Sequence, residues 1–190
     1  MRVARSIVVV LLCAAVLIGG LTVLNYAEKR YLSAAFPLSY TDEVNISAKE
    51  FGVSPSLIYA VIYIESRFDP MVVSSANARG LMQMTESTFD FVAYRMKETG
   101  RYTYDDLFDP QVSIRYGTYL LSYLITTFHN EETALAAYNA GISVVSQWLL
   151  DPDCSADGVH LEHIPYSETE NYVLRVVETR KRFCRIYSIV

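Results

Sequence analysis

Apolar residues recur at helical spacing along most of the chain. In the segment 55–65 they follow an i, i+3, i+4 pattern, after a serine–proline pair that suits the start of a helix. No segment shows the alternation of apolar and polar residues that is typical of a half-buried strand. A Ser-Glu-Thr-Glu sequence from Ser167 fits a capping box. The pattern therefore predicts an all-α fold, with helices over residues 41–51, 55–69, 85–97, 112–128 and 167–186, and one or two helices over 133–149, interrupted near Gly141.

The segment 7–24 departs from this pattern, because its only non-hydrophobic residues are two glycines and one threonine. A run of about 18 apolar residues can nearly span a bilayer as a helix. Arg2 and Arg5 precede the run, which places the N-terminus in the cytoplasm by the positive-inside rule. We therefore expect a cytoplasmic stub and membrane anchor over residues 1–30, and one domain outside the membrane over 31–190. A cleaved signal peptide and a buried soluble helix are the alternatives.

Composition narrows the class of function. Without Arg2 and Arg5 the chain holds 14 basic and 21 acidic residues, so nucleic acid is a poor partner. Aromatic residues make up 13% of the chain and charged residues only 19%, which excludes general disorder. Cys154 and Cys184 could pair in an oxidising exterior. Two histidines near Cys154 are weak grounds for a metal site, so we expect neither a metal nor a cofactor.

Three parts of the chain carry polar groups that a core does not require. Glu65 ends an otherwise apolar helix. Apolar surroundings raise the pKa of a carboxyl group. A carboxyl that stays protonated near neutral pH can act as a general acid. The loop 74–84 combines small residues with Gln83, whose amide both donates and accepts hydrogen bonds. The segments 136–141 and 164–172 contain tyrosines, whose rings and hydroxyls suit a sugar.

Together these segments resemble the catalytic domain of the soluble lytic murein transglycosylases, relatives of goose-type lysozyme, over about residues 47–177. Four blocks typical of that family occur in order: Glu-Ser-x-Phe-x-Pro from Glu65, Ser-x-x-Gly-Ala-x-Gly-Leu-Met-Gln from Ser74, Ala-Tyr-Asn-x-Gly, and Ile-Pro-aromatic-x-Glu-Thr-x-x-Tyr-Val. Asn77 stands where the family has glycine, and Glu86 where it has proline. Asparagine tolerates a left-handed backbone, and an acid suits the first turn of a helix.

The resemblance implies a lysozyme-like helical domain that cleaves the β-1,4 bond between N-acetylmuramic acid and N-acetylglucosamine in peptidoglycan. Glu65 matches the single catalytic acid and base of the family, which protonates the leaving oxygen and then deprotonates the C6 hydroxyl of the sugar. That hydroxyl closes onto C1 and gives a 1,6-anhydro product without water, while the substrate's own N-acetyl group stabilises the cationic centre. The residues that match substrate-contacting or supporting positions are Ser74, Met82, Gln83, Tyr138, Asn139 and Tyr172.

Peptidoglycan glycan strands and the membrane are therefore the expected partners, together with an envelope protein complex. The expected location is the bacterial cytoplasmic membrane, with the catalytic domain facing the wall. Two alternatives stay open. A hydrolytic muramidase would use water and leave a reducing end. A second carboxylate placed to activate water would favour it, and Asp69, Asp105 and Asp106 are candidates. The other is a catalytically silent, membrane-anchored module that binds glycan.

Overall fold

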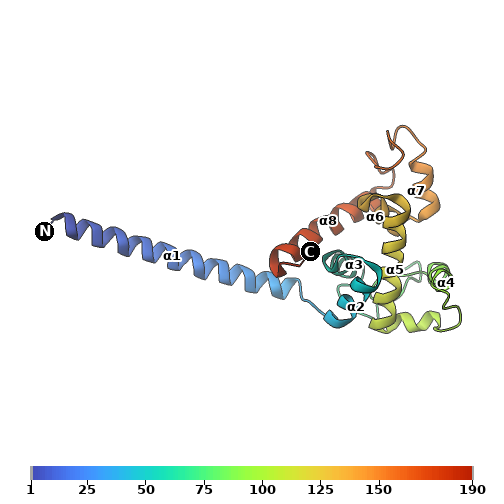
Figure 1. The fold of residues 1–190 in the computed structure, drawn as a ribbon, viewed down its shortest axis with the longest axis horizontal. Coiled ribbons are helices and arrows are strands. Elements are labelled where there is room, and N and C mark those ends of the chain that lie inside the picture. The colour runs from blue at the N-terminus through green and yellow to red at the C-terminus, as the bar shows by residue number, and fades with distance from the viewer. Residues whose placement is uncertain (1, 190) are drawn as a thin grey trace. The chain divides into compact units, whose positions relative to one another are not determined.

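The computed structural model describes residues 2–189, with side chains from residue 14 onward, and divides into two compact units (Figure 1). The first unit, residues 1–38, is built on one helix, α1 (Arg2–Ala35). Apolar side chains are exposed along the described part of α1. No helix of the described residues combines the length and the apolar character that a membrane crossing needs. Part of the predicted anchor, residues 1–13, falls outside the described side chains.

The second unit, residues 39–190, is helical, which confirms the predicted fold class. Among the described residues, β pairing is limited to two isolated bridges in the loop before α4, where Arg79 pairs with Val73 and with Met84. The elements of this unit are α2 (Thr41–Phe51), α3 (Pro55–Glu65), α4 (Glu86–Arg95), the 3-10 helix η1 (Tyr104–Phe108), α5 (Pro110–Phe128), α6 (Glu131–Ala140), α7 (Ile142–Trp148) and α8 (Ser167–Tyr187).

Side-chain caps start three of the helices. The side chains of Thr85, Asp109 and Asn130 each accept a hydrogen bond from a backbone N–H in the first turn of α4, α5 and α6, respectively. The predicted capping box of α8 is wrong: Ser167 is already helical, and Tyr166, the residue before it, makes no side-chain cap. Helix α8 therefore begins without the side-chain acceptor that the sequence suggested.

Helix α3 ends earlier than predicted, and this end positions Glu65. The chain leaves the helix at Ser66, and the next two residues, Arg67 and Phe68, adopt left-handed backbone angles (φ 54° and 66°). Such angles are uncommon for residues other than glycine and cluster at functional sites. The chain thus turns sharply away directly after Glu65, which leaves the glutamate side chain on the last turn of the helix rather than along its side.

Helix α3 is held in place by the packing of its apolar face. It packs along α8, and α5 packs against α2 and α6 (Figure 1). At the contact of α3 with α8, the rings of Tyr59 and Phe183 stack 5.5 Å apart, and Phe68 lies against both rings. Aromatic pairs of this kind add about 0.5–1.5 kcal/mol beyond the area they bury. The cluster fixes both α3 and the turn that follows Glu65.

Both cysteines outside the N-terminal helix are free thiols. Cys154 is buried in the loop after α7, and Cys184 is half-buried near the end of α8. The loop after α7 lies beside the start of α8, not its end (Figure 1). The disulfide that the sequence allowed is therefore not formed, because the two residues lie near opposite ends of the same helix.

Candidate active site

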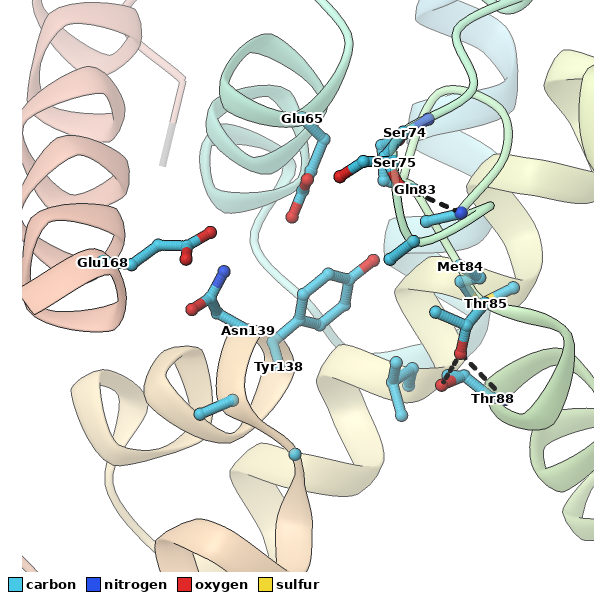
Figure 2. Close-up of a pocket in the computed structure, with 15 residues that line it drawn as sticks. Glu65, Ser74, Ser75, Gln83, Met84, Thr85, Thr88, Tyr138, Asn139 and Glu168 are labelled. Atoms are coloured by element: carbon cyan, nitrogen blue, oxygen red, sulfur yellow. Dashed lines mark hydrogen bonds between the residues drawn. The ribbon is translucent and has the colours of Figure 1, made fainter. Parts of the chain in front are cut away.

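Glu65 projects from the end of α3 into a cleft of about 430 Å3 (Figure 2). The walls come from the loop before α4, from the start of α4, from the junction of α6 and α7, and from the start of α8. Four of the residues predicted to contact substrate or to catalyse line this cleft beside Glu65: Ser74, Gln83, Tyr138 and Asn139. The cleft also contains polar residues that the sequence analysis did not assign, namely Ser75, Thr85, Thr88 and Glu168.

Burial raises the pKa of Glu65 from its usual 4.5 to about 7. Two weaker effects oppose the rise: an interaction with the Tyr172 hydroxyl, and the positive charge of Arg175. A carboxyl with a pKa near 7 is partly protonated at neutral pH and can also carry the negative charge. It can therefore give a proton in one step and take one in the next.

Two tyrosines flank the Glu65 carboxyl. Tyr138 lies across the cleft, and its hydroxyl donates a hydrogen bond to the carbonyl oxygen of Met82 at 2.7 Å (Figure 2). Tyr172 is buried, and its hydroxyl interacts with the Glu65 carboxyl. Burial and the nearby Glu65 charge raise the pKa of both phenols well above 10, so both stay neutral. These two neighbours of the acid are therefore neutral phenols.

The loop 72–84 is folded so that it presents Ser74 and Gln83 to the cleft. Asn77 takes a left-handed backbone (φ 60°), as the sequence analysis expected of the residue that replaces glycine. Gly80 also has a positive φ (76°), and a Cβ there would collide with the backbone carbonyl of Leu107. Only glycine satisfies both conditions, so Gly80 lets the loop lie directly against η1.

The cleft-facing groups of the loop are fixed by hydrogen bonds within it. The Ser74 hydroxyl accepts a hydrogen bond from the backbone N–H of Ala78 (3.0 Å). The Gln83 side-chain nitrogen donates to the carbonyl oxygens of Val72 (3.0 Å) and Gly80 (2.9 Å). Because both of its N–H groups are engaged, Gln83 offers the cleft its carbonyl oxygen, which is an acceptor for a hydroxyl or an amide of a ligand.

Met82 is a correction to the sequence prediction, because it does not reach the cleft. Its side chain is fully buried and lies against Gly117, where any larger residue would collide with it. Its backbone is held by Ser113, whose hydroxyl accepts from the Met82 N–H at 3.2 Å, and by Tyr138. Met82 therefore supports the loop from the core. Tyr172 does not line the cleft either, although its buried hydroxyl interacts with Glu65.

Asn139 and Glu168 form the end of the cleft opposite α4 (Figure 2). The Thr169 hydroxyl donates to the Asn139 side-chain oxygen at 2.7 Å, which ties α8 to the end of α6. Glu168 is exposed and its carboxylate is directed toward the cleft. In the sequence, Glu168 stands out only as the glutamate of the Ile-Pro-aromatic-x-Glu-Thr block. That block does not indicate whether the glutamate binds sugar or joins two helices.

The three aspartates considered as a second carboxylate lie outside the cleft. Asp69 accepts from the Met71 N–H (2.9 Å), and Asp105 pairs with Arg79. Asp106 accepts from the N–H of Thr103 (2.7 Å) and helps to start η1. Among the described residues that line the cleft, Glu65 and Glu168 are the two carboxylates.

The model of the protein family "Transglycosylase SLT domain" matches residues 42–156, which is more than half of the chain. The chain belongs to this family. The soluble lytic murein transglycosylase of Escherichia coli (strain K12) is 34% identical over 149 residues, which cover 77% of this chain and 23% of that protein. The membrane-bound lytic murein transglycosylase C of Edwardsiella ictaluri is 28% identical over 171 residues, which cover 77% of this chain and 47% of that protein.

The SLT fold also matches a solved structure. An inactive glutamate-to-glutamine mutant of the lytic transglycosylase Slt from Pseudomonas aeruginosa superimposes with a TM-score of 0.70 and 30% sequence identity. The match covers 81% of this chain and 25% of that one. The chain thus spans about a quarter of the length of these soluble relatives, and about half of the membrane-bound one. The lysozyme-like helical fold of this SLT domain is accordingly confirmed.

Proposed function

We propose that the protein is a peptidoglycan lytic transglycosylase that cleaves the β-1,4 bond between N-acetylmuramic acid and N-acetylglucosamine. The observation that carries the proposal is the position of Glu65: a carboxyl with a pKa near 7, at a helix end, inside the cleft formed by the family blocks. The names of the SLT relatives, which are lytic murein transglycosylases, support the same activity.

In the first step, protonated Glu65 gives its proton to the glycosidic oxygen as the C1–O bond breaks. N-acetylglucosamine leaves with a new hydroxyl, and the substrate's own N-acetyl group stabilises the positive charge that develops at C1. Burial raises the pKa of Glu65 and so keeps it partly protonated near neutral pH, while Tyr138 and Tyr172 stay neutral beside it. The cleft therefore provides the proton, and the substrate provides the group that stabilises the cation.

In the second step, the Glu65 carboxylate accepts the proton of the C6 hydroxyl, and the C6 oxygen bonds to C1. The product is a 1,6-anhydro sugar, and Glu65 returns to its protonated form. No water is consumed. An intramolecular attack of this kind gains a large effective concentration when the sugar is held in the reactive conformation. We assign this positioning to Ser74, Gln83, Tyr138 and Asn139, whose side chains line the cleft.

Hydrolysis is the second candidate, because Glu168 brings another carboxylate to the cleft. In an inverting hydrolase a second carboxylate activates water from the face of the sugar opposite the acid. If Glu168 had that role, Glu168→Gln would abolish turnover as completely as Glu65→Gln. We expect instead that Glu168→Gln weakens substrate binding and leaves cleavage measurable, because the Glu168 side chain is exposed to solvent, whereas Glu65 is half-buried.

We also propose that the N-terminal segment anchors the protein in the bacterial cytoplasmic membrane, with the catalytic domain facing the wall. The support is the apolar run over residues 7–24, the exposed apolar side chains of α1, and the membrane-bound relative. Fractionation of cells that express the full chain tests this. The protein should stay in the membrane pellet after a wash with high salt and be released by detergent.

The activity is tested with the full chain, kept in detergent, on purified peptidoglycan. Wild-type protein should release muropeptides that are one water lighter than the hydrolytic products, and Glu65→Gln should release none while keeping the helical content of the wild type. Release of muropeptides by Glu65→Gln at the wild-type rate would show that another residue is the acid.

A further inference from the structure

The loop that carries Ser74 and Gln83 is also held from outside, by the 3-10 helix η1. The Tyr104 hydroxyl of η1 donates to the carbonyl oxygen of Asn77 and lies 3.1 Å from that of Met84. The Asn77 N–H in turn donates to the Ser74 carbonyl oxygen at 2.9 Å, and Met84 directly follows Gln83. Tyr104 therefore contacts the loop backbone next to both of its cleft-lining polar side chains.

Neighbouring side chains hold the Tyr104 ring in place. The Arg79 guanidinium lies over the ring, 4.2 Å from its centroid, and also pairs with the adjacent Asp105. Phe89 of α4 lies 6.0 Å from the Tyr104 ring, and Phe89 itself stacks at 5.3 Å on the buried ring of Tyr116 in α5. The hydroxyl is thus presented to the loop by a ring that is anchored in the core.

The turn that Tyr104 contacts has an unfavourable backbone conformation. Asn77 is left-handed (φ 60°) and stands where the SLT family has glycine. Glycine adopts this conformation about as readily as a right-handed one, whereas the Cβ of any other residue disfavours it, even in asparagine. Arg79 also donates to the Asn77 side-chain oxygen, at 3.4 Å. A loop with asparagine at this position therefore depends more on outside contacts than a loop with glycine would.

Tyr104 acts at a distance from the substrate. Neither Tyr104 nor Arg79 is among the described residues that line the cleft, whereas Ser74 and Gln83 line it beside Glu65. Groups that orient a substrate lose much of their effect when they are displaced by a fraction of an ångström. A change at Tyr104 would therefore reach the reaction through the loop backbone.

We propose that Tyr104 is a positioning residue for the reaction of Glu65: it holds the left-handed turn at Asn77 and so fixes Ser74 and Gln83 in the cleft. The inference rests on the proposed cleavage of glycan, because positioning is measured on that reaction. It makes the hydroxyl of a tyrosine outside the cleft a determinant of turnover, and it links this requirement to the asparagine at position 77.

The first experiment compares the full chain, kept in detergent, with Tyr104→Phe, which removes the hydroxyl and keeps the ring. Initial rates of muropeptide release at increasing concentrations of solubilised glycan strands give kcat and KM. We expect kcat to fall roughly 3- to 10-fold and KM to change less than about twofold, because the cleft side chains remain but are less well placed. Tyr102→Phe is the matched control: this ring packs on Tyr116 at 5.8 Å, and its loss of a hydroxyl should leave kcat unchanged.

The same substitution in an Asn77→Gly background tests whether Tyr104 acts through the turn. Glycine holds the left-handed conformation without help from the phenol, so Tyr104→Phe should lower kcat by less than about twofold in that background. A tyrosine that only stabilises the core would lower kcat by the same factor in both backgrounds. Denaturant unfolding measures the same coupling without substrate: the shift of the midpoint caused by Tyr104→Phe should also be smaller in Asn77→Gly.

Failure of the positioning role and failure of the proposed function give different results. If Tyr104→Phe turns over as fast as wild type, or loses the same factor with asparagine and with glycine at position 77, Tyr104 does not position the reacting groups through this turn, even though the protein cleaves glycan. If wild type releases no muropeptides while the unfolding midpoints still show the coupling, the contact exists, but the proposed function fails and the positioning role fails with it.

Discussion

The Tyr138 hydroxyl donates a 2.7 Å hydrogen bond to the carbonyl oxygen of Met82 and so joins α6 to the loop that carries Gln83. The bond crosses the cleft within reach of Glu65, whose charge raises the pKa of the Tyr138 phenol. Tyr138 thereby fixes the position of the two walls of the cleft relative to each other, on either side of the acid. Its hydroxyl acts through the loop backbone, and its side chain lines the cleft.

Tyr138→Phe removes this link and keeps the ring. We expect a loss of about 1 kcal/mol in the free energy of unfolding, the usual net value of one hydrogen bond. We also expect kcat/KM to fall roughly 10- to 100-fold, because small displacements of positioning groups are costly to catalysis. Initial rates on peptidoglycan and denaturant unfolding measure both effects. Tyr94→Phe, at an exposed position of α4, is the control. A change of less than twofold in the kcat/KM of Tyr138→Phe would contradict the positioning role.

The raised pKa of Glu65 has a cost in stability that depends on pH. The folded-state pKa of about 7 lies above the ordinary value of 4.5, so the folded protein holds a proton that the unfolded chain has lost. The penalty is absent below pH 4.5, grows as pH rises, and is complete above pH 7. Glu65→Gln removes it, and should stabilise the protein by roughly 1–3 kcal/mol at pH 8 and by little at pH 4. Unfolding midpoints at both pH values test this; a difference that does not depend on pH would show that the carboxyl is not desolvated.

The charge of Arg175 contributes to the pKa of Glu65, and we expect it to affect the alkaline limb of the activity profile. Its positive charge lowers the pKa of Glu65, although burial dominates. Arg175→Gln should therefore raise that pKa further, keep Glu65 protonated to higher pH, and move the alkaline limb of kcat/KM upward. Arg182→Gln removes the same charge from a later turn of α8 and should leave the limb in place. Identical profiles for Arg175→Gln and wild type would mean that the Arg175 charge is screened from the acid.

Glycine can be required in a loop because of a left-handed backbone or because a Cβ has no space. Substitutions of Gly80 and Gly100 distinguish these two reasons. Both have a similar positive φ (76° and 81°), but a Cβ on Gly80 would strike the Leu107 carbonyl, whereas a Cβ on Gly100 meets open space. Gly100→Ala should cost about 1–2 kcal/mol, the strain of a left-handed residue. Gly80→Ala should cost more and should also reduce activity, because it displaces the loop with Ser74 and Gln83. Equal losses of stability, with full activity in both variants, would contradict the account of the loop.

The sequence was most informative where chemistry and backbone geometry coincide. Glu65 is predictable from the four ordered family blocks, since an acid at a helix end is by itself usually only solvated. Asn77 is predictable because a left-handed position tolerates few residue types. The buried side of the loop was not predictable. Met82 and Gln83 are neighbours, and whether each faces the core or the cleft depends on the left-handed turn at Gln83 (φ 47°). Nothing in a helical pattern indicates that turn.

The exact start of α8 was also not predictable from the sequence. The spacing of Ser167 and Glu170 fits a capping box, but the helix begins one residue too early for it. At this start of α8, Glu168 lies on the wall of the cleft. Its placement follows from how α8 packs against α3 and α6, which is a contact between distant parts of the chain.

The most direct test of the central claim is to let the full-length protein digest peptidoglycan in water labelled with heavy oxygen and to weigh the released muropeptides. If Glu65 directs the C6 hydroxyl onto C1, the products contain no label at the new end and are one water lighter than the hydrolytic ones. Products with a labelled reducing end would show that water attacks C1, and would contradict the transglycosylase mechanism in favour of hydrolysis.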